Sequence, residues 1–308
     1  MADHELSRED EHVHYDFDRD RDPVLTVDSG DTVAVGCVDA GDGQLPPDAA
    51  PEDVRAVDAP GHPMTGPIEI EGAEPGDTLA VEILDVNHEG IGWTYVAPGA
   101  GFLPEEFPDF AVHTWDLDGD VGYFNGIEVP LHPFPGNLGL APAEPGPHST
   151  IPPRDVGGNL DIKHLTPGST LYLPVEVAGG LFSIGDLHAA QGDGEVCITA
   201  IEIPGTVTVR LRLADRDVDG PQLETSGPFA PAGHVDGDEV DVRAVAGLGE
   251  DVNEASREAV REMISLLVEE TDLTREQAYM LCSTAVDLKV NEVVNQTVVV
   301  TAYLGVRL

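Results

Sequence analysis

The chain has 308 residues, of which 58 are aspartate or glutamate and only 15 are lysine or arginine, so its formal net charge is −43. Nucleic acids and anionic membrane surfaces would repel such a chain, and both are excluded as partners. No apolar run reaches the roughly 18 residues of a membrane-spanning helix, whereas a hydrophobic content of 41% is enough for a sizeable core.

Short alternating apolar runs separated by glycine-containing turns mark the first half of the chain. The runs are residues 24–27, 33–38, 68–71 and 79–84, and the turns are Ser-Gly-Asp-Thr at 29–32 and Pro-Gly-Asp-Thr at 75–78. Proline followed by glycine suits the two central positions of a type II turn. We therefore predict short strands joined by tight turns, the first two forming a hairpin.

The middle of the chain, residues 89–150, is rich in proline and contains both tryptophans, Trp93 and Trp115. Proline interrupts both helices and central strands, so this region is predicted to be irregular. Long ordered loops of this kind either wall a binding site or cover the edge of a sheet.

The second half repeats the turns, with strands predicted at 171–177, 196–203 and 207–213, and ends in helices. Residues 254–270 carry one apolar stripe. Thr274 is the predicted cap of a second helix, with Gln277 at the capping-box position. That helix is expected to end near Asp287, and residues 292–304 return to strand.

The predicted fold class is therefore mainly β. We expect β-sandwich or barrel units with Pro/Gly turns, plus a C-terminal helical hairpin packed on the sheet. The chain is read as one unit, residues 1–308, or as two β subdomains of about 1–150 and 151–308, because similar turns occur in both halves.

Three cysteines, Cys37, Cys197 and Cys282, cannot all pair, and each lies among apolar neighbours. Buried reduced thiols in a cytoplasmic protein are the expectation. The first residues are acidic and lack the basic and apolar regions of a signal peptide, which agrees with a cytoplasmic location.

Acidic residues run from Asp3 to Asp287 instead of forming a tail. This composition is typical of halophilic proteins, in which surface carboxylates hold water and cations and high salt screens their repulsion. Most of these acids are therefore expected to be solvated, and a catalytic role for any one of them needs a separate argument.

The densest chemical motif is Gly-Asp-Leu-His-Ala-Ala-Gln-Gly-Asp-Gly-Glu-Val-Cys at 185–197. Asp186 and His188 are two positions apart, as are Asp193 and Glu195, so each pair points to one side of an extended backbone. Carboxylate and imidazole suit zinc and related divalent metals, with calcium as a second candidate. The alternative is an acidic, glycine-rich surface loop.

This segment resembles the acetamidase/formamidase family, whose members hydrolyse short amides to a carboxylate and ammonia. Further segments follow the family's order: GPHSTIPPR at 146–154, GGNLD at 157–161, GSTLYLP at 168–174, LFSIG at 181–185 and EQAY at 276–279. The resemblance covers nearly the whole chain and implies hydrolysis of formamide or acetamide. The chain departs from the family pattern at two places: Leu187 stands where a small residue is expected, and residues 99–137 resemble the family less than the rest does. Both departures are expected to influence which amide is accepted.

In such a reaction a metal ion activates water and polarises the carbonyl group. Asp186 and His188 are the predicted ligands, and His14 and Asp39 are predicted to complete the set from a distance. His14 could instead be a surface histidine and Asp39 a turn residue. The other histidines outside the motif, His62 among them, are expected to be structural or exposed.

Proton transfer to the leaving nitrogen requires a carboxylate beside the metal, and Glu195 is the predicted general base and acid, with Asp193 as its alternate. Asn159, His148 and Gln191 are the predicted substrate-binding residues. Asp161, next to the Gly-Gly pair at 157–158, is a further candidate for orienting a ligand.

Two alternatives stay open. One is a cysteine nucleophile as in nitrilase-like amidases, in which Cys197 would act with Glu195 and with either Lys163 or Lys289, although the apolar run around Cys197 favours a core position. The other is a non-catalytic β-sandwich protein that binds a metal or a small ligand. Besides a small amide, the expected partner is a second copy of the chain, in a homodimer or higher homo-oligomer that covers sheet edges.

Overall fold

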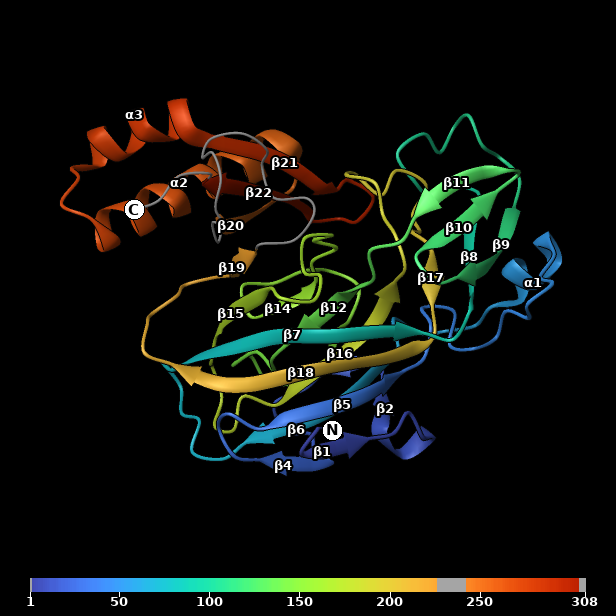
Figure 1. Cartoon of the computed structure of the whole chain (residues 1–308), viewed down its shortest axis with the longest axis horizontal. Coiled ribbons are helices and arrows are strands. Elements are labelled where there is room, and N and C mark those ends of the chain that lie inside the picture. The colour runs from blue at the N-terminus through green and yellow to red at the C-terminus, as the bar shows by residue number, and fades with distance from the viewer. Residues whose placement is uncertain (1, 226–241, 305–308) are drawn as a thin grey trace.

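A computed structural model describes residues 2–225 and 242–304, and strands dominate these ranges (Figure 1). Two large sheets enclose a shared apolar core, and two helices cover one end of the first sheet. The mainly β fold class with a C-terminal helical pair is thereby confirmed.

The first sheet contains nine of the described strands. In spatial order they are β1 (His4–Leu6), β5 (Thr32–Cys37), β18 (Gly205–Ala214), β7 (Thr78–His88), β15 (Thr170–Pro174), β19 (Gln222–Thr225), β20 (Val242–Gly249), β22 (Val298–Leu304) and β21 (Val286–Glu292). Only the pair β1–β5 is parallel among these described pairs.

The second sheet has eleven described strands. Its main path is β11 (Ile127–Pro130), β10 (Val121–Phe124), β9 (Ala111–Asp118), β8 (Ile91–Val96), β17 (Glu202–Ile203), β16 (Phe182–His188), β12 (Phe134–Gly139) and β14 (Gly157–Asn159). The strand β6 (Met64–Ile70) pairs with β16 and with both β2 (Val13–His14) and β4 (Leu25–Val27). A separate pair joins β3 (Asp16–Phe17) to β13 (His148–Ser149), and short helices lie at η1 (Asp10–His12) and α1 (Pro51–Ala56).

The predicted glycine turns are present, but they connect different sheets. At Glu74–Asp77 the backbone N–H of Asp77 donates to the carbonyl oxygen of Glu74, and Gly76 takes a φ of 100°, as a type II turn requires. The predicted first hairpin is wrong, because β4 pairs with β6 whereas β5 pairs with β18 and β1. Each of these turns therefore carries the chain from one sheet to the other, and both halves of the chain contribute to both sheets.

The core lies between the two sheets. It includes Val33 and Val35 of β5, Ile68 of β6, Phe182 of β16 and Val207 of β18, all of them completely buried. Alternating apolar residues along each strand turn one face toward this layer, which is where most of the hydrophobic stabilisation arises.

The C-terminal helices α2 (Val252–Glu270) and α3 (Arg275–Ala285) match the prediction closely. The Asp251 side chain caps α2, and Thr274 and Gln277 form the predicted capping box of α3. The apolar face of α2 packs on β20 and β22, with Ala259 and Met263 buried against Val245 and Val300. None of the described helices is both long and apolar enough to cross a membrane.

Two predicted segments differ from the structure. The proline-rich middle contains the antiparallel strands β8 to β11, because most of its prolines lie in the connections between strands. The predicted strand 196–203 is wrong except for β17. Glu195 and Ile198 have φ values of 45° and 86°, a left-handed conformation that an extended strand cannot contain.

Candidate active site

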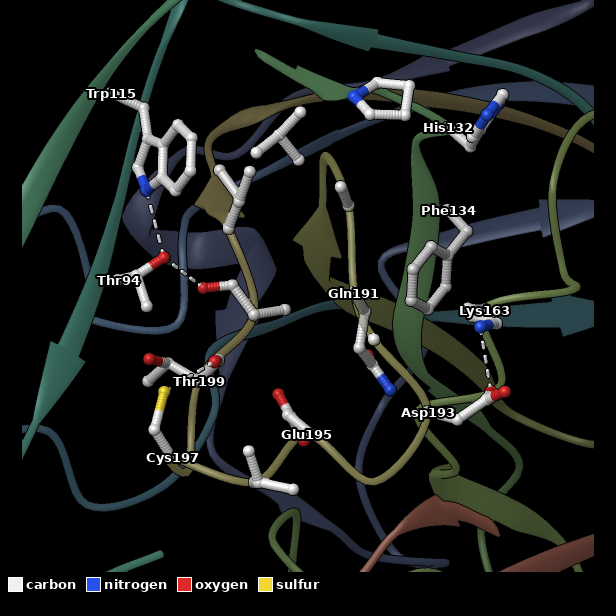
Figure 2. A pocket seen from close by; sticks show the side chains of 17 residues that line it. Thr94, Trp115, His132, Phe134, Lys163, Gln191, Asp193, Glu195, Cys197 and Thr199 are labelled. Atoms are coloured by element: carbon white, nitrogen blue, oxygen red, sulfur yellow. Dashed lines mark hydrogen bonds and ion pairs between the residues drawn. The ribbon is translucent and has the colours of Figure 1, made fainter. Parts of the chain in front are cut away.

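The motif that the sequence analysis singled out begins in strand β16 and continues into the irregular segment 189–201. This segment separates two cavities, of about 430 and 330 Å³, and the side chains of Glu195 and Thr199 line both. Figure 2 shows the larger cavity, with Glu195 and Cys197 on one side and the ion pair between Lys163 and Asp193 on the other. The smaller cavity contains a dense cluster of titratable side chains.

Asp186 and His188 meet as predicted, with 3.5 Å between Oδ1 of the carboxylate and Nε2 of the ring. Both side chains are almost completely buried. Asp186 has a φ of 53°, so the contact depends on a left-handed residue within β16 and not on simple strand alternation.

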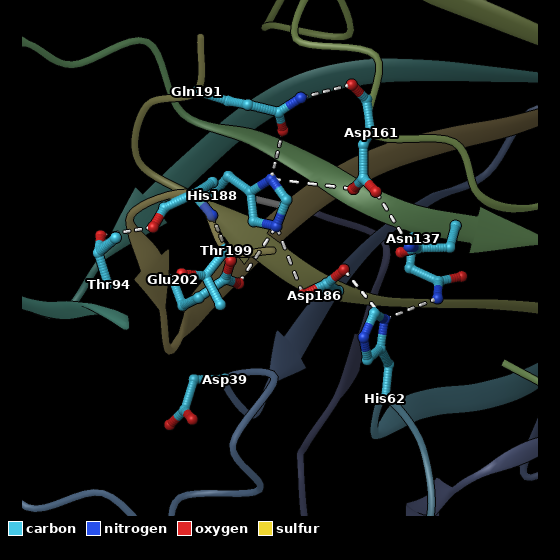
Figure 3. Close-up of polar contacts among 12 residues, drawn as sticks. Asp39, His62, Thr94, Asn137, Asp161, Asp186, His188, Gln191, Thr199 and Glu202 are labelled. Carbon is cyan, nitrogen blue, oxygen red and sulfur yellow. Dashed lines mark hydrogen bonds and ion pairs between the residues drawn. The ribbon is translucent and has the colours of Figure 1, made fainter. Parts of the chain in front are cut away.

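Two further carboxylates surround the same imidazole (Figure 3). Strand β17 pairs with β16 and places Oε2 of Glu202 3.2 Å from Nε2 of His188. The chain leaving β14 places Oδ1 of Asp161 4.0 Å from Nδ1 of the same ring. Glu195 completes a second group with His188 and Glu202, in which the ligand atoms lie within 4.8 Å of one another.

The backbone around these carboxylates is unusual. Seven described residues other than glycine have a positive φ, and three of them are Asp161, Asp186 and Glu195. Such conformations cost free energy in most residues and concentrate at functional sites. The surrounding strands therefore hold these three carboxylates in positions that a relaxed chain would not adopt.

Gln191 fixes the orientation of His188. Its side-chain oxygen accepts a hydrogen bond from Nδ1 of the ring at 2.9 Å, while its nitrogen donates to the backbone oxygens of Asp161 and Asn291. Because Nδ1 is used in this way, Nε2 is directed at Asp186 and Glu202. A metal-binding histidine is normally held by such an outer hydrogen bond.

Two more side chains hold the carboxylates. Asn159 donates from Nδ2 to Oδ2 of Asp161 at 2.9 Å. His62 places Nδ1 3.2 Å from Oδ2 of Asp186. Burial opposes a charge on His62, but the Asp186 carboxylate outweighs it and raises the pKa of His62 to about 9. His62 was expected to be structural or exposed, but its ring contacts a carboxylate of the cluster.

The electrostatics favour a cation. Burial, reinforced by neighbouring carboxylates, holds the pKa values of Asp161, Glu195 and Glu202 above their usual range. Burial would also raise the pKa of Asp186, but His62 and His188 lower it well below normal. Four carboxylates thus share one buried space, and a positive charge among them would relieve their repulsion.

These residues fit a divalent metal ion. Oδ1 of Asp161, Oδ1 of Asp186 and Oε2 of Glu202 are buried and have no hydrogen-bond partner among the described residues. All three oxygens face the imidazole of His188. Buried carboxylate oxygens normally have partners, so three such atoms around one imidazole are the donor set that a metal would complete.

Other predicted site residues lie outside this cluster. Nε2 of His14 contacts Oγ of Ser183 at 2.9 Å, and Oδ1 of Asp39 accepts from the Trp93 indole at 3.1 Å and from the N–H of Gly41. His148 contacts the backbone oxygen of Glu144 at 2.9 Å. None of the three belongs to the possible metal-binding groups in the described ranges, and Asp39 stands apart in Figure 3.

Asp193 also points away from the imidazole cluster, because its carboxylate pairs with Nζ of Lys163 at 3.0 Å. Sequence reasoning left out Glu202 altogether and gave His62 no role. No local pattern marks either residue, since each reaches the cluster through strand pairing and chain crossing.

Comparison with known proteins identifies the family of the chain. The sequence profile of the Acetamidase/Formamidase family matches residues 2–149 and 143–307. An acetamidase of Mycolicibacterium smegmatis is 31% identical over 298 residues, covering 75% of this chain and 73% of that protein. A formamidase of Methylophilus methylotrophus is 32% identical over 265 residues, covering 67% of this chain and 65% of that protein, so the chain spans slightly less than two thirds of its length.

The fold is shared as well. The crystal structure of an acetamidase from Bacillus halodurans superposes with a TM-score of 0.87 and 34% sequence identity, covering 97% of this chain and 96% of that one. The chain therefore belongs to the acetamidase/formamidase family, whose members are amidases that act on short amides.

Proposed function

We propose that this chain hydrolyses short linear amides, formamide or acetamide, to a carboxylate and ammonia at a divalent metal, zinc in the first place and calcium in the second. The observation that carries the proposal is a set of three buried carboxylate oxygens, from Asp161, Asp186 and Glu202, that face the imidazole of His188 and have no hydrogen-bond partner among the described residues. These four side chains would hold the ion, in place of the set with His14 and Asp39 expected from the sequence.

A metal ion held there would lower the pKa of water and polarise the amide carbonyl. Glu195 lies within reach of the same space, and its raised pKa suits a group that both accepts and returns a proton. Its carboxylate takes the proton of the attacking water and delivers it to the amide nitrogen. The water oxygen stays bonded to the carbonyl carbon as the C–N bond breaks, so ammonia leaves, and the carboxylic acid that is formed releases its remaining proton to become a carboxylate.

Asn159 is proposed to hold the substrate. Its Oδ1 atom is buried and has no hydrogen-bond partner in the described ranges. Asn159 lines the smaller cavity, as Asp186 and His188 do. A free amide oxygen in that position can accept a hydrogen bond from the substrate NH2 group. Gln191, whose side chain is occupied by protein partners, is instead proposed to orient His188.

The test is an amide panel on protein purified in molar KCl. Metal content is measured, and ammonia release from formamide and acetamide is followed before and after prolonged chelation and after addition of zinc or calcium. We expect chelation to abolish activity and one of these ions to restore it. Full activity of metal-free protein would overturn the mechanism, and bound metal without ammonia release would favour the non-catalytic alternative.

We also propose that the chain acts in the cytoplasm as a homo-oligomer. The three cysteines are free, which agrees with a reducing compartment. Strand β21 ends its sheet, and Leu288 on this edge and Tyr279 and Met280 on the adjoining α3 are exposed apolar side chains. Light scattering in molar KCl, compared between the chain and its Leu288→Lys variant, tests whether this edge joins two copies.

A further inference from the structure

We infer that the chain, beyond formamide and acetamide, also accepts amides with a flat apolar acyl group, such as benzamide, prefers them to the two small amides, and receives this group against the apolar residues that line the smaller cavity. This inference rests on the proposed amide hydrolysis at the cluster of Asp186 and His188. It concerns the acyl side chain of the substrate, which does not react. The carboxylates and the imidazole of the cluster do not determine what this side chain is.

The size of the cavity is the first argument. The smaller cavity has a volume of about 330 Å³, and the carboxylate cluster forms part of its lining. Cavities of about 300 Å³ and above are typical of ligands much larger than formamide or acetamide, which have three and four heavy atoms. Much of this space would stay unfilled with either small amide bound.

The second argument is an aromatic wall. Trp93 and Tyr95 project from β8 into the lining of this cavity and stack on each other, with 5.2 Å between ring centroids and 7° between planes. The Trp93 indole donates to Oδ1 of Asp39, and the backbone N–H of Tyr95 donates to Oγ1 of Thr199 at 3.0 Å. Each ring covers one face of the other, so the stacked pair is held rigid and offers an outer ring face or edge against which a planar group can pack.

The third argument is the chemistry of the remaining wall. Val54 and Val57, at the end of α1, line the cavity together with Ala59, Phe110 and Ile151. The chain contains 58 acidic residues, but the four carboxylates that line this cavity all belong to the possible metal-binding groups. A charged acyl group would find no partner against this wall, whereas an apolar ring would be desolvated there.

Asp39 gains a role from this arrangement. It was expected to bind the metal, but its Oδ1 atom accepts from both the Trp93 indole and the Gly41 N–H. Burial raises the pKa of Asp39, and these hydrogen bonds oppose the rise. Asp39 is therefore a positioning residue for the aromatic wall.

The experiment compares kcat/KM for formamide, acetamide and benzamide with the metal-loaded protein in molar KCl. We expect benzamide to exceed acetamide by about tenfold or more, the gain that a well-filled apolar pocket supplies. Val57→Phe fills the cavity and should lower the benzamide-to-acetamide ratio by about tenfold. The matched control is Val129→Phe, which fills the larger cavity and should leave that ratio unchanged.

Product inhibition gives a readout that does not depend on turnover. Benzoate should inhibit acetamide hydrolysis more strongly than acetate does, and Val57→Phe should remove the difference. Acetamide hydrolysis without any preference for benzamide or benzoate would overturn this inference while leaving the proposed function intact. A ratio that responds to Val129→Phe instead of Val57→Phe would also overturn it. Absence of ammonia from all three amides would contradict the proposed function.

Discussion

His62 Nδ1 lies 3.2 Å from Oδ2 of Asp186, and this contact ties the segment before β6 to β16, the strand that carries Asp186 and His188. Since Oδ1 of Asp186 faces His188, the two oxygens of one carboxylate face two different rings. His62 thus holds one oxygen of Asp186 while the other faces His188, whereas the sequence analysis offered Asp161 for orienting a ligand and gave His62 no role.

Replacing His62 by glutamine should weaken metal binding by about 10- to 100-fold, the usual effect of removing a group that orients a metal ligand. Competition with a chelator of known affinity measures the loss. His148→Gln is the matched control, because that ring contacts the Glu144 backbone oxygen and belongs to neither metal-binding group of the described residues. Equal metal affinities of the two variants would contradict the role of His62.

Glu195→Gln keeps the shape of the side chain and removes its ability to carry a proton. Turnover of acetamide should fall by about 100-fold or more, as in other cases of lost general acid–base catalysis, while the metal is retained. Steady-state kinetics together with metal analysis check both statements. Asp193→Asn serves as the control, since that carboxylate pairs with Lys163. If Asp193→Asn were instead the inactive variant, the proton carrier would be Asp193.

Cys197→Ala should leave the chemical step nearly unchanged. Cys197 shares the larger cavity with Glu195 and Lys163, but its Sγ atom lies 3.4 Å from the backbone oxygen of Thr199, and Lys163 is engaged by Asp193. Single-turnover rates of ammonia release distinguish chemistry from a loss of packing. Loss of ammonia release with the metal still bound would promote the cysteine-nucleophile mechanism.

Glu292 makes stability depend on pH. Burial raises its pKa to about 7, although the N–H groups of Val294 and Asn295 donate to its carboxylate and oppose the rise. Since the folded-state pKa is above the unfolded one, its contribution is fully present below the ordinary glutamate pKa of about 4.5 and is lost as pH rises through about 7. Above that pH the folded chain carries a buried carboxylate.

Glu292→Gln should therefore be more stable than the unchanged chain at about pH 8, by up to roughly 3 kcal/mol, and the advantage should vanish toward about pH 4.5. Urea unfolding in molar KCl across this range measures the difference. Glu269→Gln, on the exposed face of α2, controls for the loss of one negative charge. A difference that did not vary with pH would exclude Glu292 as the titrating group.

Stability should also rise steeply with salt. The net charge of −43 makes the folded surface repel itself. The screening length falls from about 10 Å at about 0.1 M ionic strength to about 3 Å at about 1 M, which removes most of this repulsion. Thermal melts at fixed pH in a KCl series and a NaCl series follow the effect, and a difference between the two cations would reveal specific binding. A melting temperature that stayed constant from low to molar salt would refute the halophilic interpretation.

Local patterns in the sequence determined the features whose physics is local. Alternating apolar residues located most strands, and proline–glycine pairs located the turns, because a positive φ after proline is a property of a few residues. The Thr274–Gln277 capping box marked the start of α3 for the same reason. The spacing of Asp186 and His188 drew attention to the pair, although the left-handed backbone of Asp186 and not strand alternation brings the two side chains together.

Tertiary structure decided which strands pair and which side chains complete the site. Pairing of β17 with β16 is what places Glu202 beside His188, and the crossing before β6 is what places His62 beside Asp186. The left-handed backbone of Glu195 turned an expected strand into the segment between two cavities. Contacts between residues distant in the chain depend on the packing of the whole core, and no spacing along the sequence encodes them.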